Sequence, residues 1–500
     1  MLTRRHVLIS VATGVGSVLL LACGGPAAAT TGTAVSKTGT AATTAASGAT
    51  AAKTNSTVSV ATAASVAAVA PSGAKVKLTY WFWGAPQEKA SDEKLVAAYN
   101  AAHPDVAVAP IYVPGDYVTK FETAFAGNQG PDTFYINPTS GYQWSCSGLL
   151  LDQKPYLDRQ HVDPKTKWHP IAQWWFQDKY VGTGISLEPI LLYYNSDLFK
   201  QAGVAEPPHS PDTAWHWDAF LATAQKLTHA GSGGTATWGV LPGRTYQSLL
   251  ALIYQTGSTP FGKNFEQSQL TDPAFTEPMQ AIADLATKDK VAPMPSDLTG
   301  TTGIQEFMTG RIAMYVDGQW ALQQLTDQPP SFDLRIGVIP VWQGAYFTGV
   351  GAPSAGVSAR TPHTEQAVQF ALSVVDNKQS LYNLQTGLWM GTTTDFLFGA
   401  NRKLYVDDAA QHHPQYFVEA AIGSVNRTQQ PFYKQFGAFH ETWDLLIQPA
   451  FDPVFSGKAT VKDAMTRITP QVDGALKKAA QNCAPTVDAA WLTINPGWGQ

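Results

Sequence analysis

The stretch Val76-Lys-Leu-Thr-Tyr-Trp-Phe-Trp83 decides the fold, because it has the composition of a buried strand and ends at a glycine. The next segment, Ser91 to Asn100, carries apolar residues at helical spacing. A second strand is predicted over Val106 to Val113, a second helix over Asp116 to Ala126, and a third strand over Thr133 to Ile136. Strands that alternate with helices favour parallel pairing through crossover connections. The sequence therefore predicts an α/β fold, in which binding sites lie beyond the carboxyl ends of the strands.

The N-terminus begins with a short basic head that contains Arg4-Arg5 and continues into an apolar run ending at Cys23. This run is too short for a membrane span and is typical of a secretory signal peptide. Leu20-Leu-Ala-Cys23 resembles a bacterial lipobox, and the two arginines resemble a twin-arginine signal. We expect residues 1–22 to be removed and Cys23 to be lipidated, which would anchor the protein to the outer face of the cell membrane. A plain signal peptide with a chance cysteine is the alternative.

Two further regions follow the predicted signal. Residues 23–74 consist almost entirely of Ala, Thr, Ser, Gly and Val, so they cannot bury enough apolar surface to offset their ordering entropy. We expect a disordered tether there. The remaining residues, 75–500, are more than one ordinary core accommodates, which favours two lobes.

The composition excludes several function classes. Charged residues make up 14% of the chain and the formal net charge is -5, and no basic block indicates nucleic-acid binding. No zinc-like Cys and His spacing occurs, so we expect neither a metal nor a cofactor.

Cys146 and Cys483 could form a disulfide in an oxidising compartment, but the sequence leaves this open. The chain has 15 Trp, and because Trp is rarely buried completely, some of them should lie at a functional surface.

Several motifs, in this order along the chain, resemble those of the bacterial extracellular solute-binding proteins of the sugar-binding, maltodextrin-like group. The most specific is Phe307-Met-Thr-Gly-Arg-Ile-Ala-Met-Tyr-Val-Asp-Gly-Gln-Trp320. The others are Pro131-Asp-Thr-Phe134, Gly148-Leu-Leu-Leu-Asp152, Gly184 to Phe199, Thr213 to Phe220, Ile336 to Pro340, Phe347 to Gly351 and Ser354 to Val357.

The resemblance implies two α/β lobes of the periplasmic-binding-protein type II fold, joined by hinge segments around a ligand cleft. We place the first lobe at 75–189 plus 338–385 and the second at 190–337 plus 386–500. It also implies a monomeric lipoprotein subunit of an ABC importer. Such a subunit captures a mono- or oligosaccharide by hinge closure and delivers it to separate permease subunits in the membrane.

A saccharide suits this composition, because flat aromatic rings pack on the apolar faces of a sugar and planar polar groups bind its hydroxyls. Trp320 follows Asp317-Gly318, where the family places a ring that stacks on sugar, and Glu188 lies where the lobes cross. The other candidates follow strands or crossings. The residues expected to contact ligand are Trp83, Gln87, Tyr117, Asn137, Thr139, Ser140, Glu188, Arg244, Tyr246, Trp320, Trp342, Gly349 and Trp389.

Three alternatives compete with a sugar receptor. A secreted carbohydrate-active enzyme needs two carboxylates flanking one bond, and the motifs give no support for such a pair, so we expect no catalytic residues. A ferric-ion receptor would use adjacent tyrosines such as Tyr193 and Tyr194, but on a strand these side chains point to opposite faces. A receptor for a polyamine or glycerol-phosphate would share the fold, and an anion would require a cluster of Arg and Lys in the cleft.

Overall fold

The computed structural model describes residues 75–229, 236–262, 265–298, 300–351, 353–408, 413–428 and 434–485. The predicted signal peptide, Cys23 and the predicted tether lie outside these residues. Among the described helices, none has both the length and the apolar character needed to cross a bilayer.

The first sheet is built mostly from the N-terminal part of the chain and has the strand order β2-β1-β3-β11-β5-β4. β1 pairs in parallel with both β2 and β3, as the alternating sequence pattern predicts, whereas β11 runs antiparallel between β3 and β5. Its strands are β1 (Val76–Phe82), β2 (Val106–Tyr112), β3 (Thr133–Ile136), β4 (Gln173–Phe176), β5 (Lys179–Gly184) and β11 (Ser354–Val357). The helices of this part are α1 (Pro86–Ala102), α2 (Tyr117–Ala126), α3 (Gly141–Cys146), α4 (Lys154–Arg159), α5 (Pro164–Lys167), α12 (Thr364–Val374) and α13 (Asn377–Gln385).

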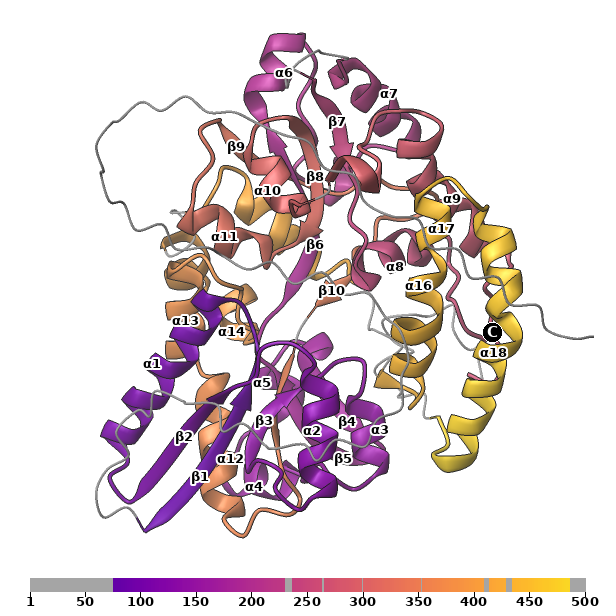
Figure 1. Cartoon of the computed structure of the whole chain (residues 1–500). Coiled ribbons are helices and arrows are strands. Elements are labelled where there is room, and N and C mark those ends of the chain that lie inside the picture. The colour runs from indigo at the N-terminus through magenta and orange to yellow at the C-terminus, as the bar shows by residue number, and fades with distance from the viewer. Residues whose placement is uncertain are drawn as a thin grey trace, which may run out of the picture. The chain divides into compact units, whose positions relative to one another are not determined.

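The second sheet has five strands in the order β10-β6-β8-β7, with β9 also paired to β6. Every residue of β6 is buried, and in Figure 1 the strand extends from the second sheet toward the first. Its strands are β6 (Glu188–Asn195), β7 (Trp238–Leu241), β8 (Ile312–Gly318), β9 (Leu334–Gly337) and β10 (Val350–Gly351). The helices around it include α6 (Ser196–Ala202), α7 (Trp217–Leu227), α8 (Tyr246–Gln255), α9 (Pro273–Thr287), α10 (Gly303–Met308), α11 (Ala321–Asp327), α14 (Thr394–Phe398) and α15 (Gly423–Val425).

The strands of the two sheets are joined along the chain at two closely spaced crossings. It leaves the first sheet at Gly184, the end of β5, and enters the second at Glu188, the start of β6. It returns from β10, which pairs with the start of β6, to β11, which pairs with the end of β5. The two crossings are therefore neighbours, and the start of β6 lies where the two sheets meet.

The C-terminal helices contact elements of both sheets. The π-helical segment η8 (His440–Ile447) and helices α16 (Gln448–Ala450), α17 (Asp452–Phe455) and α18 (Val461–Asn482) pack with one another, and α17 and α18 also contact α9. Just before them, Lys434 Nζ donates to the carbonyl oxygens of Ile171 at 2.6 Å and Gln173 at 3.1 Å, beside the first sheet. A disulfide joins Cys146 of α3 to Cys483 at the end of α18, with 5.9 Å between their Cα atoms. The pairing that the sequence left open is thus present.

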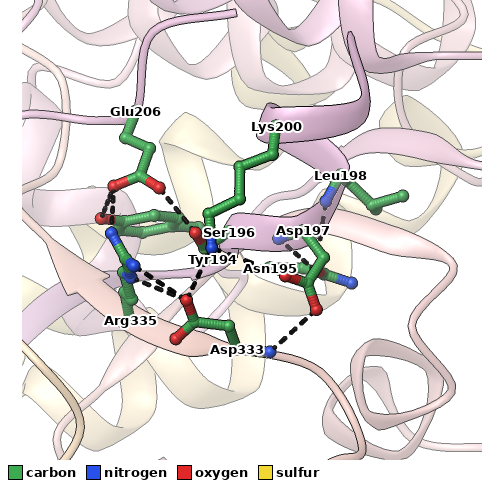
Figure 2. A network of polar contacts seen from close by, with 9 residues as sticks. All are labelled: Tyr194, Asn195, Ser196, Asp197, Leu198, Lys200, Glu206, Asp333 and Arg335. Carbon is green, nitrogen blue, oxygen red and sulfur yellow. Dashed lines mark hydrogen bonds and ion pairs between the residues drawn. The ribbon is translucent and has the colours of Figure 1, made fainter. Parts of the chain in front are cut away.

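An ion-pair network fixes the end of β6 that is remote from the crossings (Figure 2). Arg335 on β9 pairs with Glu206 at 2.7 Å and with Asp333 at 2.8 Å, and Lys200 of α6 pairs with Asp333 at 3.0 Å. Although partial burial opposes it, the hydrogen bonds from Arg335 and Lys200 lower the pKa of Asp333. The carboxylate of Asp333 is therefore stabilised as an anion in this paired network of Glu206, Asp333, Arg335 and Lys200.

Candidate ligand-binding site

Strand ends from both sheets converge at the crossings. Trp83 directly follows β1, Asn137 directly follows β3, and Trp320 follows β8 by two residues. β6 runs antiparallel to β8 and pairs its Ile190 with Gly318, so the start of β6 lies beside the end of β8. Glu188 is therefore brought next to Trp320 by the sheet register.

A cavity of about 300 Å³ lies at this place. The first sheet and its loops contribute side chains on one side, and the second sheet and the first turn of α8 contribute the rest. The lining residues are Trp83, Glu88, Tyr135, Asn137, Pro138, Thr139, Glu188, Thr245, Tyr246, Gln247, Trp320, Gly351, Pro353 and Trp389.

Two tryptophans are held in the cavity wall by close packing. The Trp83 ring lies against Tyr117 with 4.5 Å between ring centroids and against Tyr135 with 5.2 Å. The Trp320 indole lies over Gly318 and Gly351, where an added Cβ would fall 2.1 Å and 2.7 Å from ring atoms. Only glycine leaves room for the ring at these positions, so local sequence on two strands sets the orientation of Trp320.

Polar groups of the cavity are arranged for hydrogen bonding. Asn137 Oδ1 accepts from the Thr139 backbone N–H at 2.9 Å and from its hydroxyl at 2.7 Å, which fixes the loop after β3. Trp389 lines the cavity with only 2% of its surface exposed, and within the described part of the chain its indole N–H has no acceptor. The buried indole N–H groups of Trp168 and Trp342, which do not line the cavity, also have no acceptor among the described residues, so this feature of Trp389 does not by itself mark a ligand contact.

Two glutamates face the cavity without a basic partner. Glu188 is 5% exposed and accepts a hydrogen bond from the Ser186 hydroxyl. Burial raises the pKa of Glu188 to about 8, and the negative charge of Glu88 adds to the effect. Glu88 accepts from the Ala85 backbone N–H at 2.6 Å and from Gln323 Nε2 at 2.8 Å, and burial raises its pKa as well.

A second pocket of about 470 Å³ adjoins the first and shares Glu88 and Trp320 with it. It is lined in addition by Gln87 and by Asp317, whose pKa is raised by burial. The Gln323–Glu88 hydrogen bond crosses this pocket from α11 to α1 and so links the two sheets' helices. The two cavities, which share two lining residues, together make up the candidate site.

The structure brings together most of the residues predicted from the sequence. Seven line the first cavity and an eighth, Gln87, lines the adjoining pocket. The seven are Trp83, Asn137, Thr139, Glu188, Tyr246, Trp320 and Trp389.

Five predicted residues do not line either cavity. Tyr117 is buried behind Trp83 and donates to the Tyr135 carbonyl at 2.9 Å, and Ser140 is buried at the start of α3. Arg244 lies over the Phe455 ring at 4.5 Å, and Trp342 packs against Trp217 with 5.3 Å between rings. Gly349 approaches the backbone of Gln247 so closely that an added Cβ would lie 2.2 Å from its carbonyl oxygen, so this glycine serves packing.

Several lining residues escaped the sequence-based prediction. Thr245 is the N-cap of α8 and accepts from the Ser248 N–H, a pattern that marks a helix start but not which of its residues face a cavity. Gln247 reaches the cavity from the first turn of that helix, where the predicted Arg244 turns away. Tyr135 and Pro138 flank the predicted Asn137, and Pro353 follows the return crossing; no local signal singles them out.

The iron-receptor alternative finds no support in the placement of the paired tyrosines. Tyr193 donates to the Gly318 carbonyl at 2.9 Å and Tyr194 to Glu206 at 3.2 Å, and the two rings belong to different hydrophobic clusters. Their expected orientation to opposite faces of β6 is confirmed. Within the described ranges, no group of three or more His, Cys, Asp and Glu side chains is placed to hold a metal ion.

Residues 84–378, more than half of the chain, match the family model of the bacterial extracellular solute-binding proteins. The chain belongs to this family. An uncharacterized lipoprotein in the oleD 5' region of Streptomyces antibioticus is 25% identical over 395 residues, which cover 76% of this chain and 82% of the relative.

A multiple sugar-binding protein of Streptococcus mutans is 23% identical over 309 residues, covering 59% of this chain and 70% of the relative, and further matches are named sn-glycerol-3-phosphate-binding periplasmic proteins. Among solved structures, the ABC substrate-binding protein Lmo0181 of Listeria monocytogenes in complex with cycloalternan matches with a TM-score of 0.70 at 24% identity, covering 80% of this chain and 99% of that chain. This likeness establishes the two-lobed periplasmic-binding-protein fold.

Proposed function

We propose that this solute-binding protein captures a mono- or oligosaccharide for an ABC importer, holding it in the two adjoining cavities by closure of the lobes. The observation that carries the proposal is the pair of half-buried indoles, Trp83 from the first sheet and Trp320 from the second, in one cavity with Asn137, Thr139 and Gln247. Flat rings suit the C–H faces of a pyranose, and amide and hydroxyl groups suit its hydroxyls.

Closure follows from the way the ligand would be held. Because each sheet supplies part of the contacts, a ligand favours the closed arrangement by its differential affinity for it. Periplasmic binding proteins are a standard example of such hinge closure. The Gln323–Glu88 bond between α11 and α1 is a contact that a closed state provides.

The proposed lobe boundaries are supported in most places by the strand order. β1 to β5 and β11 fall within 75–189 plus 338–385, and β7 to β9 fall within 190–337, whereas β6, at Glu188–Asn195, begins two residues before the second range. β10, at Val350–Gly351, pairs with β6 although it lies in the range assigned to the first lobe. We therefore propose a boundary between β10 and β11 as the point of return.

The chain is further proposed to be a monomeric lipoprotein anchored through Cys23 to the outer face of the cell membrane, with the permease as its partner. The lipobox-like Leu20-Leu-Ala-Cys23 supports this, as does the printed name of the Streptomyces antibioticus relative. The lipid anchor is tested by growing cells that express the protein with labelled palmitate, followed by mild hydrolysis of the protein. Label should enter the wild type and be absent from Cys23→Ser.

A polyamine is the second candidate ligand, because the cavity is lined by Glu88 and Glu188. An anionic solute such as a glycerol-phosphate is less suited, since none of the residues that line the two cavities is Lys, Arg or His in the part of the chain that the structure describes. No catalytic chemistry is proposed.

A thermal-shift screen against saccharides, followed by calorimetry, tests the function. Trp320→Ala should weaken the best ligand more than about tenfold, about 1.4 kcal/mol. Trp175→Ala is the matched control, because Trp175 is a half-buried indole on β4 whose N–H donates to Gln173 at 3.0 Å, away from the cavity. Unchanged affinity in Trp320→Ala, or the absence of any saccharide ligand, would refute the proposal.

A further inference from the structure

Three carboxyl groups line the two adjoining cavities, and none of the described residues that line them is Lys, Arg or His. Glu188 faces the first cavity, Asp317 faces the second, and Glu88 faces both. The donors that hydrogen-bond these carboxyls are neutral: the hydroxyls of Ser186 and Tyr315, backbone N–H groups, the amide of Gln323 and the side chain of Trp320. In the described part of the chain none of the three carboxyls takes part in an ion pair.

The carboxyl groups at the two ends of β6 have different partners. At the other end of β6, Asp333 and Glu206 are each paired with Arg335 (Figure 2). A carboxylate removed from water is strongly unfavourable unless a positive charge lies beside it. Burial raises the pKa values of Glu188, Glu88 and Asp317, and no basic side chain among the described lining residues offsets this effect. Without a ligand, the three carboxyl groups of the site therefore have no positively charged partner among the described residues.

The remaining groups of the site specify what would complete it. Trp83, Trp320 and Tyr246 present aromatic rings, which attract cations as well as sugar C–H faces. Asn137, Thr139 and Gln247 line the cavity with amide and hydroxyl groups, which suit hydroxyls or ether oxygens. A ligand that satisfies all of these carries ring hydroxyls or ether oxygens together with a positive charge.

We propose that the ligand is an amine-bearing saccharide whose ammonium group lies against Glu88 and Glu188 while its ring packs on Trp320. This inference rests on the proposed function and narrows its substrate class. Binding transfers no atoms between protein and ligand other than protons: a carboxyl that is protonated in the empty site releases its proton to solvent when the ammonium group arrives.

Matched pairs of sugars test the inference by calorimetry at about pH 6.5, where a sugar amine is protonated. Suitable pairs are glucosamine and its N-acetylated form, their two- to four-unit oligomers, and galactosamine against galactose. We expect the amine-bearing member of the best pair to bind about tenfold more tightly or better. Titrations in buffers of different ionisation enthalpy should show net proton release for that member and none for its neutral partner.

Substitutions assign the preference to the two glutamates. Glu188→Gln and Glu88→Gln should each reduce the ratio of the affinities for the amine-bearing and neutral members to about threefold or less. Glu365→Gln is the control, because Glu365 is an exposed residue that pairs with Arg159 at 2.6 Å outside the cavities, and it should retain the full preference.

The outcomes separate this inference from the proposed function. Neutral sugars that bind as tightly as their amine partners, or a preference that persists in both glutamine variants, would overturn the inference and leave the saccharide receptor intact. Tighter binding of spermidine than of every sugar would overturn both, and so would the absence of binding by any sugar.

Discussion

Acidic side chains at the two ends of β6 have different partners and opposite pKa shifts. At the end near Asn195, each carboxylate of the paired network meets a guanidinium or ammonium group, and the pKa of Asp333 falls. At the other end, Glu188 is buried with only a hydroxyl donor, and its pKa rises to about 8. Acids at one end of the strand are therefore paired with bases, whereas Glu188 at the other end has no ion pair among the described residues. About 20 Å of extended chain separates the two ends.

The contrast shows that burial alone does not decide the pKa of an acid in this protein. Asp333 is partly buried, with a side-chain exposure of 38%, and the hydrogen bonds from Arg335 and Lys200 offset its loss of hydration. The described residues that line the cavity beside Glu188 include no Lys, Arg or His.

The largest expected effect concerns the pH dependence of stability. The folded-state pKa of Glu188 is about 8 and its unfolded value is near 4.5, so between these pH values the folded state binds the extra proton. The contribution of Glu188 to the unfolding free energy therefore decreases as pH rises through this window, by an amount on the order of a few kcal/mol. Glu188→Gln should flatten the decline in unfolding free energy, measured by urea denaturation from about pH 5 to pH 8.

Asp333, at the other end of β6, gives the opposite dependence of stability on pH. Because the pKa of Asp333 is lowered, its stabilising contribution is present above its unfolded pKa and is lost as pH falls through the folded value. Asp333→Asn should change stability in neutral solution and leave the pH 5 to pH 8 slope as in wild type. Equal slopes in Glu188→Gln and wild type would contradict the pKa assigned to Glu188.

Removing the base of the paired network should have the next largest effect. Arg335→Leu leaves Glu206 and Asp333 without their main partner, and we expect a loss of about 2 kcal/mol in unfolding free energy, discounted for partial exposure. Arg159→Leu is the control, since the Arg159–Glu365 pair is 56% and 42% exposed and should contribute less than about 0.5 kcal/mol. Comparable losses of unfolding free energy in the two variants would show that the network contributes no more than an exposed ion pair.

Single hydroxyl deletions should have the smallest effects and separate stability from binding. Tyr194 donates to Glu206 at the paired end, and Tyr315 donates to Asp317 beside the second cavity. Each Tyr→Phe change should lower the unfolding free energy by about 1 kcal/mol. Only Tyr315→Phe should also change the calorimetric affinity of the best ligand. If Tyr194→Phe alters that affinity as much, the two ends of β6 are coupled and the comparison fails.

The sequence predicted the architecture better than the site. The strands near 76–83, 106–113 and 133–136 were confirmed as β1, β2 and β3, because alternating strand and helix patterns are local. The first helix begins at Pro86, earlier than the expected Ser91, since proline is tolerated in a first turn. The fold class follows from such local patterns.

Residues that directly follow a strand were predicted well, whereas loop residues were not. Trp83, Asn137 and Trp320 line the cavity because the strand fixes where the chain emerges. Arg244 and Trp342 turn toward Phe455 and Trp217, partners that are brought near by tertiary packing and that no local pattern reveals. The absence of a base near Glu188 depends equally on contacts between distant segments.

The bridge between Cys146 and Cys483 encloses a ring of chain with a sequence separation of 337 residues. All of the second sheet and both crossings lie inside this ring, while β1 to β3 precede it. A single protease cut anywhere between the two cysteines therefore yields two pieces that remain covalently joined. A nicked molecule would keep every wall of its ligand cavity on one covalent assembly, and only a reductant would let the fragments separate.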